Sequence, residues 1–128
     1  MRLIVGGKGQ GKLQLLLSEG KYVQEQVTDG ADCPLEDLGS RPVLNHLHLL
    51  VRRWTASGKP LDELKKRIFQ SGIPVILCDE IGSGIVPIDK AEEQWREDTG
   101  RLCCDIAAQA EIVDRVFCGL CQRIKEIK

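Results

Sequence analysis

The chain alternates between two hydrophobic patterns. A continuous apolar run occurs at 73–78, as is typical of a strand buried on both faces of a parallel sheet. Strands are also predicted at 2–5 and 112–119. Longer segments between them place apolar residues every three or four positions, which is the spacing of a helix with one buried face. Strands that alternate with helices predict an α/β fold with a mostly parallel central sheet.

The helical spacing predicts four helices, at 12–19, 43–57, 61–70 and 89–110. The second predicted helix has a continuous apolar face, formed by Val43, Leu44, Leu47, Leu50, Val51 and Trp54. The fourth is the longest, and Gly100 is its expected weak point because glycine disfavours a helix interior.

The remaining segments are expected to be strands or loops. A second strand is predicted at 21–28, where polar residues at 24–26 interrupt the apolar pattern, and a short edge strand at 124–127. The stretch 82–87 combines glycine, serine and proline, so it is predicted to be a loop.

Composition indicates a single globular domain, residues 1–128, with 42% hydrophobic and 29% charged residues. The net charge is −1 and the basic residues are scattered, so we expect no nucleic-acid partner. No apolar run approaches the ~20 residues that span a membrane, and the first strand begins too early for a signal peptide. Six cysteines without a secretory signal are typical of reduced thiols, which predicts a cytoplasmic protein.

The first strand leads directly into a glycine-rich turn with the sequence Gly6-Gly7-Lys8-Gly9-Gln10-Gly11-Lys12. Gly6, Gly11 and Lys12 match the G-x-x-x-x-G-K spacing of a phosphate-binding P-loop. Glycines let successive backbone N–H groups point inward, and the positive end of the next helix faces the same hollow. We predict that this turn and Leu13 bind nucleotide phosphates within a P-loop-type three-layer sandwich. The alternative is a glycine-rich turn that binds no nucleotide.

Asp79 and Glu80 follow the most apolar of the predicted strands. Ligands of open parallel sheets bind beyond the carboxyl ends of the strands, so these carboxylates are expected near Lys12. We predict that Asp79 holds Mg²⁺ and that Glu80 activates a substrate hydroxyl. This prediction matters because Leu13 replaces the Ser or Thr whose hydroxyl would bind Mg²⁺ in a P-loop. The alternative is that both acids only cap a loop.

His46 and His48 lie two residues apart on a predicted helix, so they are expected to point in different directions. Solvated helix residues are the favoured interpretation, with catalysis as the alternative. Arg52 and Arg53 follow on the same helix; they are expected on its solvated face, with phosphate binding as the alternative.

Cys118 and Cys121 have the spacing of a metal-binding or redox pair. A zinc site needs two further ligands, and Cys103 and Cys104 are adjacent in sequence, which does not supply a second pair at good spacing. We therefore predict no metal at these residues, and burial as small apolar side chains for most of the cysteines.

Three further segments carry a family resemblance: Asp79-Glu80-Ile81-Gly82-Ser83-Gly84-Ile85-Val86-Pro87, Trp95-Arg96-Glu97-Asp98-Thr99-Gly100-Arg101, and residues 119–125. Together with the glycine-rich turn they resemble the adenosylcobinamide kinase / adenosylcobinamide-phosphate guanylyltransferase family. That family phosphorylates adenosylcobinamide and then transfers GMP from GTP during cobalamin assembly. The resemblance covers about the first twenty and the last fifty-five residues.

The resemblance implies nucleotide-dependent phosphoryl transfer to a corrinoid precursor, with ATP or GTP and Mg²⁺. It implies that Lys12, Asp79 and Glu80 are catalytic. The other implied contacts are a substrate loop and its neighbours: Gly82, Ser83, Gly84, Val86, Pro87, Arg96 and Arg101. A homo-oligomer is compatible with this reading.

The chain departs from the family pattern at three points. Leu13 stands in place of serine, Cys103 in place of an expected asparagine, and the middle of the chain is shorter by several tens of residues. The family carries its GMP-accepting histidine in this middle segment, and His46 or His48 with Arg52-Arg53-Trp54 is only loosely similar to it. Two functional classes remain: a kinase-like or nucleotidyltransferase-like enzyme, and a nucleotide- or corrinoid-binding module without turnover.

Overall fold

The computed structural model describes residues 1–81 and 89–127. Within this part of the chain, six strands form one sheet in the order β2-β3-β4-β1-β5-β6. They are β1 (Arg2–Gly6), β2 (Val27–Asp29), β3 (Val43–Asn45), β4 (Val75–Asp79), β5 (Ile112–Phe117) and β6 (Leu120–Glu126). All neighbours pair in parallel except β5 and β6.

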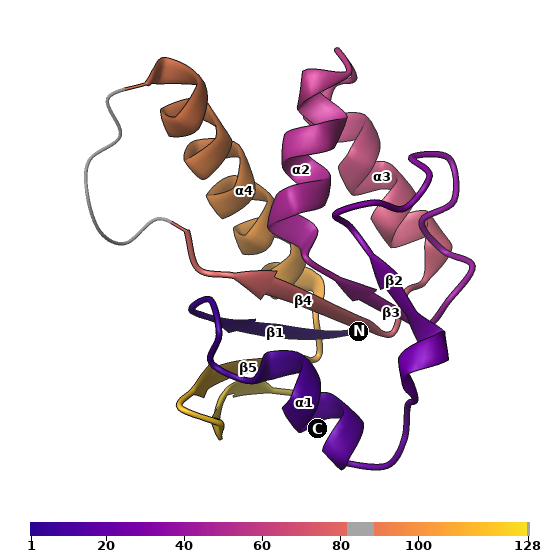
Figure 1. Cartoon of the computed structure of the whole chain (residues 1–128), viewed down its shortest axis with the longest axis vertical. Coiled ribbons are helices and arrows are strands. Elements are labelled where there is room, and N and C mark those ends of the chain that lie inside the picture. Colours follow the sequence, from indigo (N-terminus) through magenta and orange to yellow (C-terminus); the bar gives the residue numbers. More distant parts are fainter. Residues whose placement is uncertain (82–88, 128) are drawn as a thin grey trace.

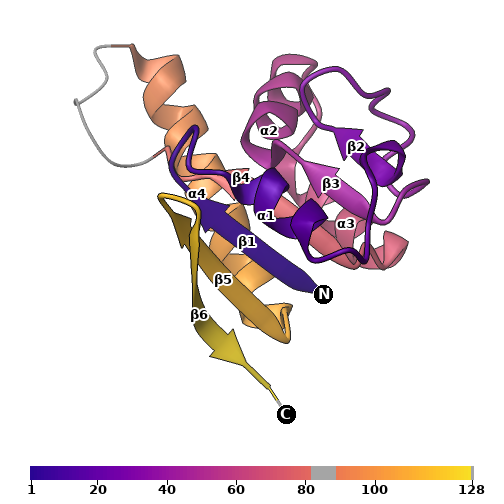
Figure 2. The ribbon, with the colours of Figure 1, turned by 60° about the horizontal axis from the view of Figure 1, so that its bottom comes forward.

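Helices cover both faces of the sheet, which gives three layers (Figures 1 and 2). α1 (Lys12–Ser18) lies on one face, and α2 (Leu47–Ala56), α3 (Leu61–Ser71) and α4 (Lys90–Gln109) lie on the other. A short 3₁₀ helix, η1 (Gln24–Gln26), precedes β2. The predicted α/β fold with a mostly parallel central sheet is confirmed.

The alternation of strand side chains creates two apolar cores, one on each face of the sheet. The core beneath α1 contains Ile4, Leu16, Val27, Val43, Val75, Leu77 and Val116. The larger core beneath α2, α3 and α4 includes Leu3, Leu44, Leu50, Trp54, Ile68, Ile76 and Ile106. The central strands are buried on both faces, which explains why their sequences are continuous apolar runs rather than alternating ones.

The predicted helix at 43–57 is wrong at its start, because residues 43–45 form strand β3 and α2 begins only at Leu47. Val43 and Leu44 contact the cores on opposite faces of the sheet, as strand residues do. His46 separates the two elements with left-handed backbone angles (φ 58°, ψ 48°) that neither a strand nor a helix continues. The backbone of β3 pairs with both β2 and β4, and these pairings outweigh the local helical spacing.

Several other boundaries also differ from the predictions. The predicted second strand at 21–28 forms only at its end, where β2 spans Val27–Asp29, because η1 occupies the polar interruption. The predicted final strand at 112–119 ends at Phe117, and β6 returns antiparallel to it through a turn at Cys118 and Gly119. Gly100 does not break α4, which is continuous. The predicted loop at 82–87 lies outside the described residues.

The inner face of the hairpin formed by β5 and β6 contains a buried carboxylate. Asp114 has no exposed side-chain area; Arg2 approaches it to 2.7 Å and Arg123 to 2.9 Å. Burial disfavours its ionised form, but hydrogen bonds from Arg123 and Arg2 outweigh burial and hold the pKa of Asp114 below its ordinary value. The ion pairs therefore tie the start of β1 to both strands of the hairpin.

Replacement Asp114→Asn is expected to lower the free energy of unfolding by about 2 kcal/mol, the scale of charged hydrogen bonds at a partly exposed network. Because the folded-state pKa is lowered, the stabilisation is present at neutral pH and is lost as the pH falls below about 4. Urea unfolding of both proteins at pH 7 and at pH 3 measures this, and the difference between them should shrink at pH 3. An equal difference at both pH values would contradict an electrostatic role for Asp114.

None of the helices in the described ranges 1–81 and 89–127 is long and apolar enough to cross a membrane.

Candidate functional site

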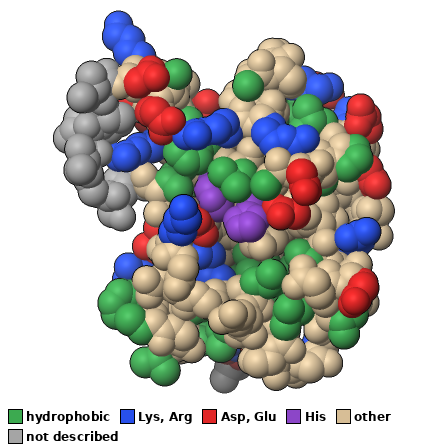
Figure 3. Space-filling model, in the orientation of Figure 1, with side chains coloured by type: hydrophobic (Ala, Val, Ile, Leu, Met, Phe, Trp, Pro, Cys, Tyr) green, Lys and Arg blue, Asp and Glu red, His purple; other side chains and the backbone are tan. Residues whose placement is uncertain are grey.

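The carboxyl ends of β1 and β4 lie side by side, with Gly6 paired to Asp79. A pocket of about 640 Å³ opens beside this edge, in the size range of small-molecule sites. Figure 3 shows the two histidines of the chain at this hollow, with basic and acidic side chains around them. The pocket is lined by Lys8, Gly9, Gly11, Lys12, Leu13, Gln14, Asn45, His46, His48, Leu49, Asp79, Glu80, Ile81 and Trp95.

The glycine-rich turn forms the connection between β1 and α1, as predicted. Gly9 (φ 74°) and Gly11 (φ 89°) adopt left-handed backbone angles that favour glycine. A Cβ on Gly6 would lie 2.4 Å from the carbonyl oxygen of Val116, so β5 approaches too closely for any side chain there. Gln10 ties the turn to the end of the β5–β6 hairpin. Its side-chain oxygen accepts from the backbone N–H of Cys118, and its carbonyl oxygen accepts from the backbone N–H of Gly119.

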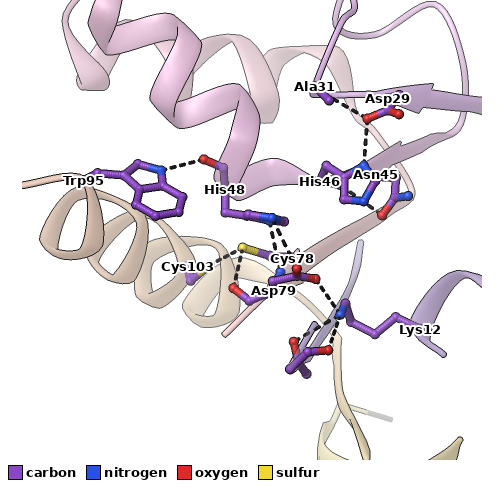
Figure 4. A network of polar contacts seen from close by, with 12 residues as sticks. Lys12, Asp29, Ala31, Asn45, His46, His48, Cys78, Asp79, Trp95 and Cys103 are labelled. Atoms are coloured by element: carbon purple, nitrogen blue, oxygen red, sulfur yellow. Dashed lines mark hydrogen bonds and ion pairs between the residues drawn. The ribbon is translucent and has the colours of Figure 1, made fainter. Parts of the chain in front are cut away.

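Lys12 is buried at the inner end of the pocket (Figure 4). Its ammonium group donates to the carbonyl oxygens of Gly6 and Gly7 at 3.1 and 2.9 Å, and it lies 2.6 Å from Oδ1 of Asp79. All three hydrogens of the ammonium therefore have an acceptor within the protein. An anion entering the pocket would exchange for these acceptors.

Asp79 faces His48 as well as Lys12 (Figure 4). Its backbone N–H donates to Nδ1 of His48 at 3.2 Å, and its Oδ2 lies 3.3 Å from Nε2 of the same ring. Burial lowers the pKa of His48, against the opposing effect of the Asp79 carboxylate, so the imidazole is neutral near pH 7. Because Nδ1 accepts a hydrogen bond, the ring proton resides on Nε2.

Glu80 turns away from Lys12 towards β5. Its carboxylate accepts from Nε and Nη2 of Arg115 at 3.1 and 3.3 Å, and both side chains are substantially exposed. Its backbone N–H donates to the carbonyl oxygen of Gly6. Glu80 lines the pocket, but its carboxylate is engaged by Arg115 and is not part of the Lys12–Asp79 pair.

His46 also lines the pocket, which differs from the prediction that the two histidines diverge on one helix. Because His46 precedes α2, its ring lies 5.7 Å from that of His48, edge to face. Nδ1 of His46 lies 2.7 Å from Oδ1 of Asp29 at the end of β2. Burial opposes ionisation of Asp29, but hydrogen bonds from Ala31 and His46 outweigh it and lower the pKa of Asp29.

The backbone around His46 depends on a close approach by Gly30. A Cβ on Gly30 would lie 2.5 Å from the carbonyl oxygen of His46 and 3.0 Å from that of Asn45. The side-chain oxygen of Asn45 accepts from the backbone N–H of His46, and the carbonyl of Asn45 accepts from Gly30. These contacts hold His46 in its left-handed conformation. Nothing local in the sequence assigned Asp29 or Gly30 to the site.

Of the other predicted site residues, some line the pocket, some lie away from it, and some lie outside the described residues. Leu13 packs on the core beneath α1 while lining the pocket, and Lys8 is exposed at the rim. Gly82, Ser83, Gly84, Val86 and Pro87 lie outside the described residues. Arg96 and Arg101 are on α4, and neither lines the pocket as it is described.

Arg52 and Arg53 have partners away from the phosphate-binding turn. Arg52 pairs with Glu92 and stacks on Trp95, with its guanidinium carbon 3.7 Å from the ring centroid. Arg53 donates to the carbonyl oxygens of Gly30 and Cys33, so it supports the segment before β3.

The cysteines are free, but the prediction that most are buried is wrong. Cys33 and Cys78 are buried, Cys103 is half-buried against Cys78, and Cys104, Cys118 and Cys121 are exposed. Within residues 1–81 and 89–127, no group of three or more metal-binding side chains is present. The pair at 118 and 121 therefore has no additional ligands from the described chain.

We expect protein purified without added metal to contain no stoichiometric zinc. Two thiols at an exposed hairpin turn leave half of a tetrahedral zinc shell unfilled. Elemental analysis of the wild type and of Cys121→Ser measures this directly. Stoichiometric zinc that disappears in the variant would overturn the prediction.

The pocket thus combines a buried lysine, the carboxylates of Asp79 and Glu80, and two imidazoles beside the glycine turn. No protein-family model matches the chain, and no curated protein is similar to it in sequence.

Proposed function

We propose that the protein binds a nucleoside triphosphate at the glycine-rich turn and transfers its terminal phosphoryl group to a hydroxyl of a corrinoid precursor. The observation that carries the proposal is the contact between Lys12 and Asp79 at the adjacent carboxyl ends of β1 and β4. A buried lysine and a carboxylate beside a glycine-rich turn are the two charged groups that P-loop enzymes use towards phosphate and Mg²⁺.

The residues fit both ligands in their chemistry. Gly9 and Gly11 line the pocket and a side chain at Gly9 would meet open space, so phosphate oxygens can approach the backbone there, and Lys12 provides a positive charge within the same pocket. Oxygen ligands suit Mg²⁺, and Asp79 is the side chain that would hold it; Leu13 provides no hydroxyl. Bound Mg²⁺ would neutralise charge on the phosphates.

The proposed sequence of events begins with Lys12. Its ammonium group gives up its contacts with Asp79 and the two carbonyl oxygens and donates to phosphate oxygens. This leaves Oδ1 of Asp79 free. A bond then forms between the acceptor oxygen and the terminal phosphorus, and the bond from that phosphorus to the bridging oxygen breaks. The proton of the acceptor hydroxyl passes to a base, for which Glu80 and His46 are the pocket residues with suitable groups.

The corrinoid acceptor comes from the family resemblance of the sequence, since nothing in the pocket identifies it. The experiment is titration with ATP and with GTP, with and without Mg²⁺, followed by an assay for phosphorylation of adenosylcobinamide. Mg²⁺-dependent binding and a phosphorylated corrinoid support the proposal. Binding without turnover would favour the binding module instead, and absence of binding would refute both.

A second candidate reaction is guanylyl transfer, and the observation that favours it is the contact between His46 and Asp29. The contact engages Nδ1 and leaves Nε2 of His46 without a hydrogen-bond partner among the described residues. Attack by Nε2 on the α-phosphorus of GTP would form an N–P bond and release pyrophosphate. The phosphate of a phosphorylated corrinoid would then displace the histidine.

GTP labelled at the α-phosphate tests this reaction. Acid-labile, alkali-stable label on the wild-type protein that is absent from His46→Asn would support it. Absence of label on a protein that binds GTP would exclude a histidine intermediate and leave phosphoryl transfer as the proposed reaction.

A further inference from the structure

We infer that His48 is a positioning residue that keeps Asp79 oriented towards the pocket when nucleotide draws Lys12 away. The inference rests on the proposed function, because it assigns His48 a task in nucleotide and Mg²⁺ binding. Sequence spacing had favoured a solvated helix residue at this position.

The first observation is that both nitrogens of one buried ring face the same residue. His48 is only 5% exposed. Nδ1 accepts from the backbone N–H of Asp79 at 3.2 Å, and Nε2 lies 3.3 Å from Oδ2 of Asp79 (Figure 4). The first contact is a hydrogen bond that fixes the backbone at the end of β4, and the second places the ring directly beside the carboxylate.

The second observation is how the two oxygens of Asp79 are divided. Oδ1 is 2.6 Å from the ammonium of Lys12, while Oδ2 is on the side of His48. If Lys12 turns to a phosphate, Oδ1 loses its partner, while the ring of His48 still lies against Oδ2. Without that contact the carboxylate would gain rotamers, and ordering it again would weaken Mg²⁺ binding.

The third observation is that His48 is itself held by a separate element. Its backbone carbonyl accepts from the indole N–H of Trp95 on α4 at 2.7 Å, and its ring lies 6.3 Å from that of Trp95. His48 is the second residue of α2, between the fully buried Leu47 and Leu50. The backbone of His48 is therefore held within α2 and by α4, while its ring contacts β4.

This geometry argues against two other roles for His48, metal binding and general-base catalysis. A metal ligand needs a free ring nitrogen, but Nδ1 is engaged by the backbone N–H and Nε2 carries the proton. A general base needs the same free nitrogen. Groups that hold a metal-binding carboxylate in place typically change metal affinity or activity about 10–100-fold when removed.

The experiment measures nucleotide affinity by calorimetry, with Mg²⁺ and with EDTA, for the wild type and for His48→Ala. We expect the gain in affinity from Mg²⁺ to fall about 10-fold or more in the variant, while the affinity in EDTA is unchanged. His48→Gln, whose amide N–H can replace Nε2–H, should recover part of the gain.

The matched control is Val51→Ala, which removes buried methyl groups from the same helix without touching Asp79. It should retain the full Mg²⁺ gain at temperatures well below its melting temperature. An undiminished Mg²⁺ gain in His48→Ala would overturn the inference, and so would equal weakening with Mg²⁺ and with EDTA, since that indicates a purely structural role.

A second readout needs no nucleotide. Nitrogen-15 spectra of the wild-type imidazole should show an unprotonated Nδ1 and a protonated Nε2 at His48, and a proton on Nδ1 would overturn the inference by itself. Failure of the proposed function looks different: the wild type would then bind neither ATP nor GTP, while the ring spectra would be as expected. In that case the proposed role of His48 in Mg²⁺ binding would be refuted together with the proposed function.

Discussion

Replacement Lys12→Ala is expected to weaken nucleotide binding by 1–3 kcal/mol, the scale of a charged hydrogen bond, which corresponds to about 5–150-fold in affinity. The reason is that Lys12 is the buried cation of the pocket, and its ammonium group, which now contacts three acceptors within the protein, could turn to phosphate oxygens. Calorimetric titration with ATP and GTP measures the change. Unchanged affinity in a folded variant would contradict the proposed phosphate site.

The control must separate lost phosphate binding from a broken ion pair. Lys12→Ala leaves the carboxylate of Asp79 without its cation, and this alone can destabilise the pocket. The double variant Lys12→Met with Asp79→Asn removes both charges at once and keeps the side-chain lengths. If it is as stable as the wild type but binds nucleotide more weakly in EDTA, where Asp79 holds no Mg²⁺, the effect belongs to the ammonium group.

Replacement Asp79→Asn is expected to have the largest effect on turnover, with a loss of about 100-fold or more, since electrostatic stabilisation at the phosphates is worth several kcal/mol. The amide cannot provide the anionic oxygen that Mg²⁺ prefers, yet its backbone N–H still donates to His48. The measurement is the rate of corrinoid phosphorylation and the Mg²⁺ dependence of nucleotide binding. A binding module without turnover behaves in the opposite way: loss of the negative charge improves nucleotide binding, and Mg²⁺ has no effect.

Glu80→Gln is the matched comparison at the next position. The sequence predicted that Glu80 activates a substrate hydroxyl, but in the structure its carboxylate is held by Arg115 on the surface. We therefore expect Glu80→Gln to preserve the Mg²⁺ dependence of nucleotide binding and to leave the melting temperature close to that of the wild type. A loss of turnover in this variant with Mg²⁺ dependence intact would indicate that Glu80, rather than His46, is the base for the acceptor hydroxyl.

The sequence alone predicted the parts of the site that depend on short stretches of chain. The turn at 6–12 is specified by its own glycines, because left-handed backbone angles at Gly9 and Gly11 are a local property. The apolar strand before Asp79 is equally local, since burial on both faces requires an unbroken apolar run. Parallel pairing then follows from the alternation of strands and helices, and it places Asp79 beside Lys12.

The sequence could not predict the histidine side of the pocket, because it depends on pairing between distant segments. Residues 43–45 have helical spacing, but β2 and β4 both pair with them, and backbone hydrogen bonding to neighbours decides the conformation of so short a strand. His46 then adopts a left-handed conformation, and the backbone packs so closely on residue 30 that only glycine fits there.

The partners of the charged groups were also decided only by the tertiary structure. Glu80 contacts Arg115 because only β1 lies between β4 and β5 in the sheet. Asp29 contacts His46 because β2 is next to β3. The sequence by itself indicated that the glycine turn, Lys12 and Asp79 lie at one edge of the sheet. Which of them share a hydrogen bond depended on the order of the strands in the sheet, since that order brings side chains far apart in sequence to within bonding distance.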